Sequence, residues 1–242
     1  MNKLILILSL LLPVAAFANE GVALDKAPIN AANQASLQRG AKVFVNYCLN
    51  CHSAASMRYN RLRDIGLTEE QIKANLLFAG EKVGDTMTVA INKKEAKAWL
   101  GAAPPDLSVI ARARGADWLY TYLRGFYRDD TRPTGWNNVA FDKVGMPHVL
   151  WQLQGDQVLK VTESTDAHGN KVETHQLVLA KPGKLSPGEY DILVADLVNY
   201  LVFMGEPART QRMQLGLVVL FFLAFFFVVA RALKKEYWND IH

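Results

Sequence analysis

The chain has 242 residues, of which half are hydrophobic, with 27 basic and 23 acidic side chains and a formal net charge of +4. Without the two terminal segments described below, 23 basic and 21 acidic residues remain, so the main part is nearly neutral. This balance argues against a nucleic-acid-binding protein, because such proteins carry a basic patch or stripe. The length allows one large domain or two small ones.

The first 18 residues have the pattern of a secretory signal peptide. Lys3 is followed by an apolar run from Leu4 to Leu12 and by small residues that end in Ala16-Phe17-Ala18. A charged start, an apolar core and an A-x-A cleavage site are the features that such signals share. The alternative is a short membrane anchor, but the run is too short, because a bilayer core needs about 20 apolar residues. We therefore expect export and removal of residues 1–18.

Residues 19–210 are expected to form one exported, mostly helical domain with long ordered loops. Residues 19–35 are rich in alanine and asparagine and predict an extended leader. Beyond it, apolar residues three and four apart predict helices, and two β-branched runs around the turn-rich DAHGN predict a small β-hairpin. The predicted helices cover residues 36–47, 68–80, 117–123 and 186–205, and the hairpin covers residues 157–180.

Two of the predicted helices begin with a capping box. Thr68 is followed three residues later by Gln71, and Ser186 is followed by Pro187 and then Glu189. In this arrangement the hydroxyl accepts a hydrogen bond from the backbone three residues on, and the longer side chain reaches back to the cap. Proline also favours the first helical position. Local sequence signals alone therefore predict where both helices begin.

An uncharged run, Met213–Ala230, lies near the C-terminal end. As a helix it covers about 27 Å, close to the thickness of the hydrocarbon core of a bilayer. A buried core helix is the alternative, but the run has five phenylalanines and no polar face. Basic residues follow the run, which favours the cytoplasmic side for them. We expect a membrane anchor over residues 211–233 and a cytoplasmic tail over residues 234–242.

The two cysteines of the chain, Cys48 and Cys51, have two residues between them and are followed directly by His52. A structural zinc site wants four ligands, usually with a second cysteine pair, and the sequence has no such pair. A thioredoxin-like dithiol expects a βαβ pattern, whereas this motif follows an apolar helix. A disulfide would be strained and leaves the histidine without a role. Attachment of a c-type haem uses all three residues, because the thiols bond to the vinyl groups and the histidine ligates the iron.

The iron of such a haem then needs a sixth ligand or an open position. Met146 is the preferred candidate, because it lies between Gly145 and Pro147 in an irregular loop that can approach the haem. A thioether ligand favours ferrous iron, which raises the reduction potential and suits an electron carrier. The sequence leaves these alternatives open: His148, Met57, Met87 and Met204.

Together these segments resemble the cytochrome c1 family, the haem-bearing subunit of ubiquinol–cytochrome c reductase, in its bacterial form. The likeness runs from about Arg39 to the anchor and includes RGAKVFVNYCLNCHS, PPDLSVIARARG, FDKVGMP and YLVFMGEPARTQR. The cysteine motif alone is shared by all c-type cytochromes. The combination of PPDLS, the Gly-Met-Pro loop and a Glu-Pro pair before a C-terminal anchor is far more specific.

The resemblance implies one covalently attached haem c, with Cys48 and Cys51 as the thioethers and His52 and Met146 as the axial ligands. It also implies further haem-binding residues: Arg114 near a propionate, Trp118 where relatives often have tyrosine, and Pro105 and Leu107 at the haem edge. Two plainer interpretations stay open, namely a solvated arginine at a helix start and a rigid proline turn.

The resemblance implies partners as well: cytochrome b, the Rieske iron–sulfur protein and a soluble periplasmic cytochrome c, in a dimeric complex of the bacterial inner membrane. The chain would transfer electrons, with no catalytic residue and no independent catalytic activity of its own. The nearest alternative is the haem c subunit of a terminal oxidase, although such subunits commonly carry an N-terminal anchor. A peroxidase-like haem enzyme would need an open iron position, and a thiol oxidoreductase would keep both thiols free.

Overall fold

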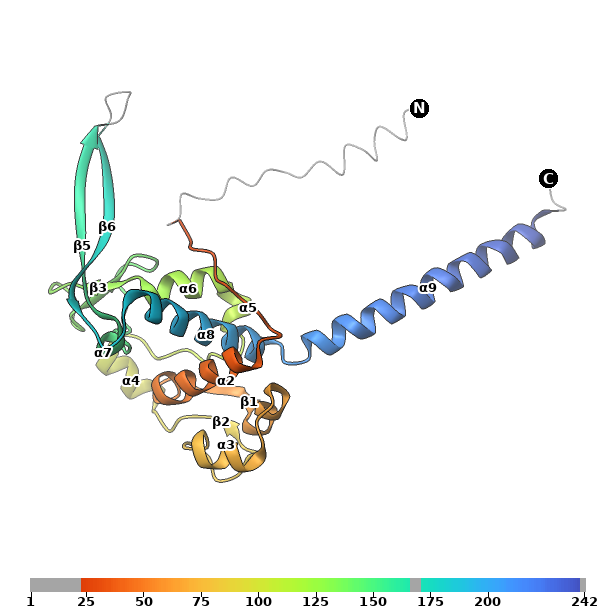
Figure 1. Ribbon diagram of the computed structural model, residues 1–242, viewed down its shortest axis with the longest axis horizontal. Coiled ribbons are helices and arrows are strands. Elements are labelled where there is room, and N and C mark those ends of the chain that lie inside the picture. The colour runs from red at the N-terminus through yellow and green to blue at the C-terminus, as the bar shows by residue number, and fades with distance from the viewer. Residues whose placement is uncertain (1–22, 166–170, 240–242) are drawn as a thin grey trace.

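The computed structural model describes residues 23–165 and 171–239, and Figure 1 shows that one long helix extends away from a mostly helical body. The helices are α2 (Gln34–Val43), η1 (Phe44–Cys48, a π-helix), η2 (Tyr59–Ile65, a 3-10 helix), α3 (Glu69–Asn75), α4 (Lys93–Leu100), α5 (Ile110–Arg114), α6 (Ala116–Arg124), α7 (Trp151–Gln154), α8 (Pro187–Gly205) and α9 (Arg209–Tyr237). Three antiparallel strand pairs are described: β1 (Ala54–Arg58) with β2 (Thr86–Met87), β3 (Phe126–Arg128) with β4 (Trp136–Asn138), and β5 (Gly155–Thr165) with β6 (Lys171–Pro182). The predicted fold class is confirmed.

The core of the body is built on the packing of α2 against α8. The apolar stripe predicted for the first helix is buried in this core, and it is made of Leu37, Ala41, Phe44 and Val45. Gly40 lies at the contact, where an added Cβ would be 2.0 Å from the carbonyl oxygen of Asp196. The two backbones therefore approach closely enough to require glycine at this position. This packing fixes α2, which leads directly into the cysteine motif.

Both predicted capping boxes are present, at Thr68 and at Ser186. The second helix, however, ends at Asn75, so its predicted end at Gly80 was wrong. Leu76 leaves the helical conformation with a φ of −135°, and the backbone N–H groups of Leu76 and Leu77 both donate to the carbonyl of Ile72. Leu76 is buried in the core at this end, so tertiary packing stops the helix before the sequence signal does.

The predicted hairpin exists as β5 and β6 and is slightly longer than expected, with Leu159 opposite Leu177. Its turn, DAHGN, lies outside the described residues. The two shorter strand pairs and the helices α4, α5 and α7 were not predicted. They are short elements, and the pairing of β1 with β2 joins segments distant in the chain, whereas β3 and β4 follow each other closely.

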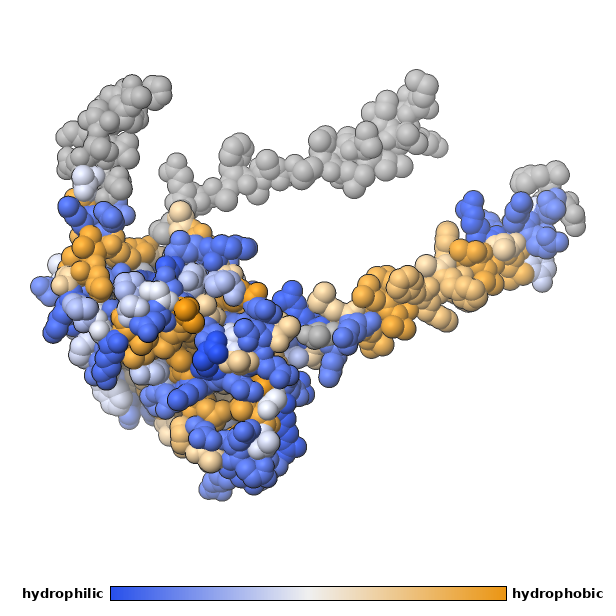
Figure 2. Space-filling model, viewed as in Figure 1, coloured by the Kyte–Doolittle hydropathy of each residue, from blue (hydrophilic) through white to orange (hydrophobic). Residues whose placement is uncertain are grey.

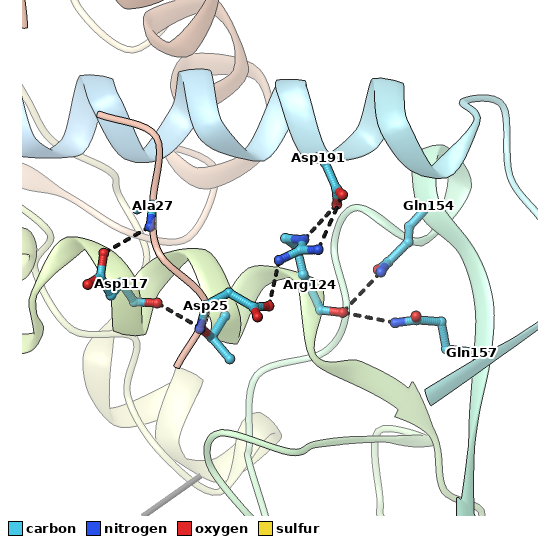
Figure 3. A network of polar contacts seen from close by, with 8 residues as sticks. Asp25, Ala27, Asp117, Arg124, Gln154, Gln157 and Asp191 are labelled. Carbon is cyan, nitrogen blue, oxygen red and sulfur yellow. Dashed lines mark hydrogen bonds and ion pairs between the residues drawn. The ribbon is translucent and has the colours of Figure 1, made fainter. Parts of the chain in front are cut away.

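The described part of the predicted leader, residues 23–33, contains no helix or strand, and polar contacts fasten it to α6 (Figure 3). Its last two predicted residues belong to α2, and residues 19–22 lie outside the described residues. The backbone N–H of Asp25 donates to Thr121 Oγ1 at 2.8 Å, and that of Ala27 donates to Asp117 Oδ1 at 2.9 Å. The guanidinium of Arg124 pairs with the Asp25 carboxylate at 2.7 Å and with the Asp191 carboxylate of α8 at 2.6 Å. One arginine therefore joins the leader, α6 and α8.

The helix α9 is the C-terminal apolar helix that the sequence predicts. Its stretch from Gln211 to Tyr237 is long and apolar enough to cross a membrane, and none of it is buried against the body. Figure 2 shows hydrophobic residues along its middle and hydrophilic residues near its C-terminal end. The predicted signal peptide, residues 1–18, lies outside the described residues.

Candidate haem site

All eight predicted site residues line one cavity of about 370 Å³ in the body. They come from the cysteine motif, the segment before α5, the helices α5 and α6, and the Gly-Met-Pro loop. The remaining lining is mostly apolar, with contributions from Leu119, Leu123, Val149, Leu197 and Leu201. The predicted residues are Cys48, Cys51, His52, Pro105, Leu107, Arg114, Trp118 and Met146.

The cysteine motif begins where α2 widens into the π-helix η1. The backbone N–H of Leu49 donates to the carbonyl of Phe44, five residues back, at 2.9 Å. A tight turn follows, in which the N–H groups of Cys51 and His52 both donate to the carbonyl of Cys48. No disulfide joins Cys48 and Cys51. Burial together with the neighbouring Cys51 raises the pKa of the Cys48 thiol to about 12. A π-helical turn of this kind often occurs at functional sites.

His52 is held in the tautomer that an iron ligand needs. Its Nδ1 lies 2.8 Å from the carbonyl oxygen of Pro105, and a carbonyl can only accept, so Nδ1 carries the proton. Burial lowers the pKa of His52, against the opposing effects of this hydrogen bond and of Asp106. The ring is therefore neutral, and Nε2 keeps its lone pair for a metal. A hydrogen bond from the other ring nitrogen commonly orients a ligating histidine.

The PPDLS segment is a strap fastened to the residues that follow His52. The backbone N–H of Leu107 donates to the carbonyl of Ser53 at 2.8 Å. The carboxylate of Asp106 accepts from the backbone N–H groups of Ala55 and Ser108, both at 2.8 Å. These bonds fix the position of the Pro105 carbonyl and with it the histidine. The strap therefore explains why this segment accompanies the cysteine motif.

Met146 is brought to the cavity by a loop that packs on the end of α4. An added Cβ at Gly145 would lie 2.8 Å from the carbonyl oxygen of Leu100, so glycine allows the close approach. The hydroxyl of Tyr122 donates to the Met146 sulfur at 3.4 Å. Within the described residues, Met146 is the one methionine that lines the cavity. The other methionine candidates are buried in the main core: Met57, Met87 and Met204.

His148, the imidazole alternative, does not line the cavity. It is 2% exposed, with its ring stacked on Phe126 at 4.8 Å and edge-on to Trp136 at 5.0 Å. Burial lowers the pKa of His148 to about 4. The geometry thus favours Met146 over His148 as the partner of His52.

The wall formed by α5 and α6 is aromatic and carries one cation. The guanidinium carbon of Arg114 lies 5.0 Å from the centroid of the Trp118 ring and 6.0 Å from that of Phe141. Trp118 in turn stacks on Tyr122 with a centroid separation of 4.8 Å. Arg114 takes part in none of the ion pairs found in the described part of the chain, so its charge is available to an anionic group in the cavity.

Two residues that support the methionine were not predicted: Tyr122, which lines the cavity, and Asn137, which lies outside it. Tyr122 lies one helical turn after Trp118, a spacing that could have suggested a shared face. The buried Asn137 side chain accepts from the backbone N–H of Lys143 at 2.8 Å and so holds the loop that leads to Met146. No local pattern in the sequence indicates that contact.

A cavity lined by two cysteines, the histidine after them and one methionine offers the set of donor groups that is typical of a c-type cytochrome. The strap, the Gly-Met-Pro loop and the C-terminal apolar helix indicate one particular family among the c-type cytochromes. Residues 25–174 match the model of the Cytochrome C1 family, and the chain belongs to that family. It is a haem c electron-transfer subunit of the cytochrome bc1 complex, with one covalently attached haem.

The chain is also similar to individual relatives over most of its length. It is 50% identical over 245 residues to "Cytochrome c1" of Allochromatium vinosum, with the whole of both chains covered. It is 30% identical to "Cytochrome c1" of Rhodospirillum rubrum, over 86% of this chain and 83% of that one. A protein of Nitrosomonas europaea named "Ammonia monooxygenase gamma subunit" is 55% identical, over 100% of this chain and 99% of the relative.

Proposed function

We propose that this chain carries electrons from the Rieske iron–sulfur protein to a soluble cytochrome c, on a haem bound by Cys48, Cys51, His52 and Met146. The observation that supports this is the shared cavity, which brings the cysteine motif and the methionine together from segments almost 100 positions apart. The bound haem supplies a reversible one-electron change at its iron. The remaining task of the protein is to hold and tune that iron.

The residues around the cavity fit this task. The carbonyl of Pro105 orients His52, and the Met146 thioether favours the ferrous state and so raises the reduction potential. The mostly apolar lining excludes water, which also disfavours the extra positive charge of ferric iron. Arg114 is proposed as the partner of a propionate, because a planar guanidinium can bind a carboxylate through two hydrogen bonds.

The membrane arrangement is part of the same proposal. Residues 1–18 are the signal peptide, residues 19–210 the periplasmic haem domain, residues 211–233 the anchor and residues 234–242 the cytoplasmic tail. The link between α8 and α9 supports a haem held near the membrane, because α8 ends at Gly205 and α9 begins at Arg209. A dimeric complex that contains cytochrome b and the Rieske protein is proposed on the family resemblance.

Rapid kinetics on the purified membrane complex test the electron path. After addition of quinol, the c-type haem should be reduced and then reoxidised when a soluble cytochrome c is added. An inhibitor that immobilises the Rieske protein should prevent the reduction. Reduction that continues without the Rieske protein, or co-purification with a terminal oxidase in place of cytochrome b, would contradict the proposal.

Reporter fusions test the orientation. A reporter fused after the last residue of the chain should be active only as a cytoplasmic protein. The same reporter fused to a chain truncated after Gly205, before α9, should behave as exported. A periplasmic signal from the full-length fusion would overturn the proposed topology.

A further inference from the structure

One hydrogen bond at the cavity joins a side chain outside the predicted site to the proposed axial ligand. The hydroxyl oxygen of Tyr122 lies 3.4 Å from the sulfur of Met146, and both residues line the cavity. A phenol is protonated at neutral pH and can donate, whereas a thioether can only accept. The direction of the bond is therefore fixed by chemistry.

The Tyr122 ring is held in place from two sides. Trp118 stacks on one side at 4.8 Å with an interplanar angle of 12°, and Phe126 meets it edge-on at 5.1 Å. The backbone carbonyl of Tyr122 accepts from the side chain of Asn138 at 2.8 Å. Little freedom is left to the phenol, so its hydroxyl keeps its direction toward the sulfur.

The methionine loop is held from the same strand. Asn137, next to Asn138 at the end of β4, accepts from the N–H of Lys143 at 2.8 Å. The Asn137 amide also donates to the carboxylates of Asp129 and Asp142, at 3.0 and 2.9 Å. Two adjacent asparagines therefore fix the donor residue and the acceptor loop relative to each other. Such a doubly supported contact is pre-organised and not incidental.

We propose that Tyr122 is a positioning residue for the axial methionine, whose hydroxyl holds the Met146 thioether in place and raises the reduction potential of the haem. The inference rests on the proposed function, in which Met146 ligates the iron. A thioether sulfur has two lone pairs, so one can face the iron while the other accepts from the phenol. The positive end of the O–H dipole then disfavours the ferric state, because that state carries the larger positive charge.

The test uses the full-length, haem-loaded protein and removes the one hydroxyl with the substitution Tyr122→Phe. Tyr120→Phe is the matched control, because Tyr120 lies on the same helix but packs under Arg124, 4.5 Å away, and does not line the cavity. The measurements are haem content, the near-infrared band of methionine-ligated ferric haem, the midpoint potential and the affinity of the ferric haem for imidazole.

Tyr122→Phe should keep its haem and show a lower midpoint potential than the wild type and the control. Imidazole should bind about fivefold more tightly, the factor that corresponds to a hydrogen bond of about 1 kcal/mol when 1.4 kcal/mol is tenfold. An unchanged potential and imidazole affinity, with the near-infrared band present, would overturn the assignment. So would loss of haem, because a residue that only positions the methionine is not needed for attachment. Absence of the band from the wild type would refute Met146 as the ligand and thus the proposed function.

Discussion

Substitution of Gly40 by alanine should destabilise the haem domain, although the same change in an exposed helix is stabilising. Gly40 is on α2 at its contact with α8, and an added Cβ would lie 2.0 Å from the carbonyl oxygen of Asp196 and 2.7 Å from Cβ of Tyr200. Ordinary contact between such atoms is about 3.5 Å, so the helices must separate by roughly 1 Å or more. The obstacle is backbone and cannot move away as a flexible side chain would.

The expected size follows from two opposing effects. Alanine gains about 1 kcal/mol over glycine from helix propensity. Overpacking of a tight core costs about 1–3 kcal/mol and sometimes more, and here it also loosens the buried contact of α2 with α8. We expect a net loss of about 2 kcal/mol. For a domain of this size that corresponds to a melting temperature lower by about 4–8 °C.

Thermal unfolding of the full-length protein in detergent, followed by circular dichroism, measures this loss. Gly188→Ala is the matched control, because a Cβ there would meet nothing within 4 Å. That variant should melt at the wild-type temperature or slightly above it. If Gly40→Ala proved as stable as Gly188→Ala, the close approach of α2 and α8 would be refuted.

Three further substitutions test the supports of the site. Asn137→Ala should cost about 1–3 kcal/mol of stability and weaken the near-infrared methionine band, because it leaves buried polar groups unpaired and frees the loop to Met146. An unaltered band would show that the loop keeps its position without the Asn137 side chain. Lys143→Gly should raise the stability by about 0.5 kcal/mol in thermal unfolding, because Lys143 has a φ of 57° that favours glycine; a loss would contradict that backbone conformation. Arg124→Leu should lower the free energy of unfolding by about 1–2 kcal/mol, because it breaks a partly exposed pairing with Asp191. It should also speed hydrogen exchange in the leader. Unchanged exchange would show that the leader is held by other contacts.

Elements with local signals could be predicted from the sequence. The last helix of the body has Ser186 and Glu189 at its start and Gly205 at its end, and the structure confirms all three roles. α4 was missed although Asn92 caps its start and Gly101, with a φ of +77°, ends it. Its signals are equally local, but its apolar stripe is weak, since only one residue of the helix is buried.

Elements that depend on tertiary contact could not be predicted. The strands β1 and β2 are short and pair across a long stretch of chain, with Ala54 opposite Met87, 33 positions away. The end of α3 at Asn75 depends on the burial of Leu76, which no cap signal reports. In each case the deciding contact joins residues whose proximity only the folded chain determines.

The residues of the candidate site likewise differ in whether a local sequence signal predicts them. Cys48, Cys51 and His52 are almost adjacent in the chain, so their spacing alone indicates a haem. Met146 followed from the chemistry of its loop together with the family resemblance. The contact between Tyr122 and Met146 joins residues 24 positions apart, and neither neighbourhood shows it. Residues that support a ligand were therefore harder to predict than the ligand itself.

We infer that the iron is bound between His52 and Met146. Near-infrared absorption of the oxidised full-length protein, compared with that of Met146→Leu, tests this ligation. We expect covalently bound haem in both proteins, a methionine–iron band in the wild type and no such band in the variant, with a lower midpoint potential. A band that persists in Met146→Leu, or that is missing from the wild type, would show that Met146 does not ligate the iron.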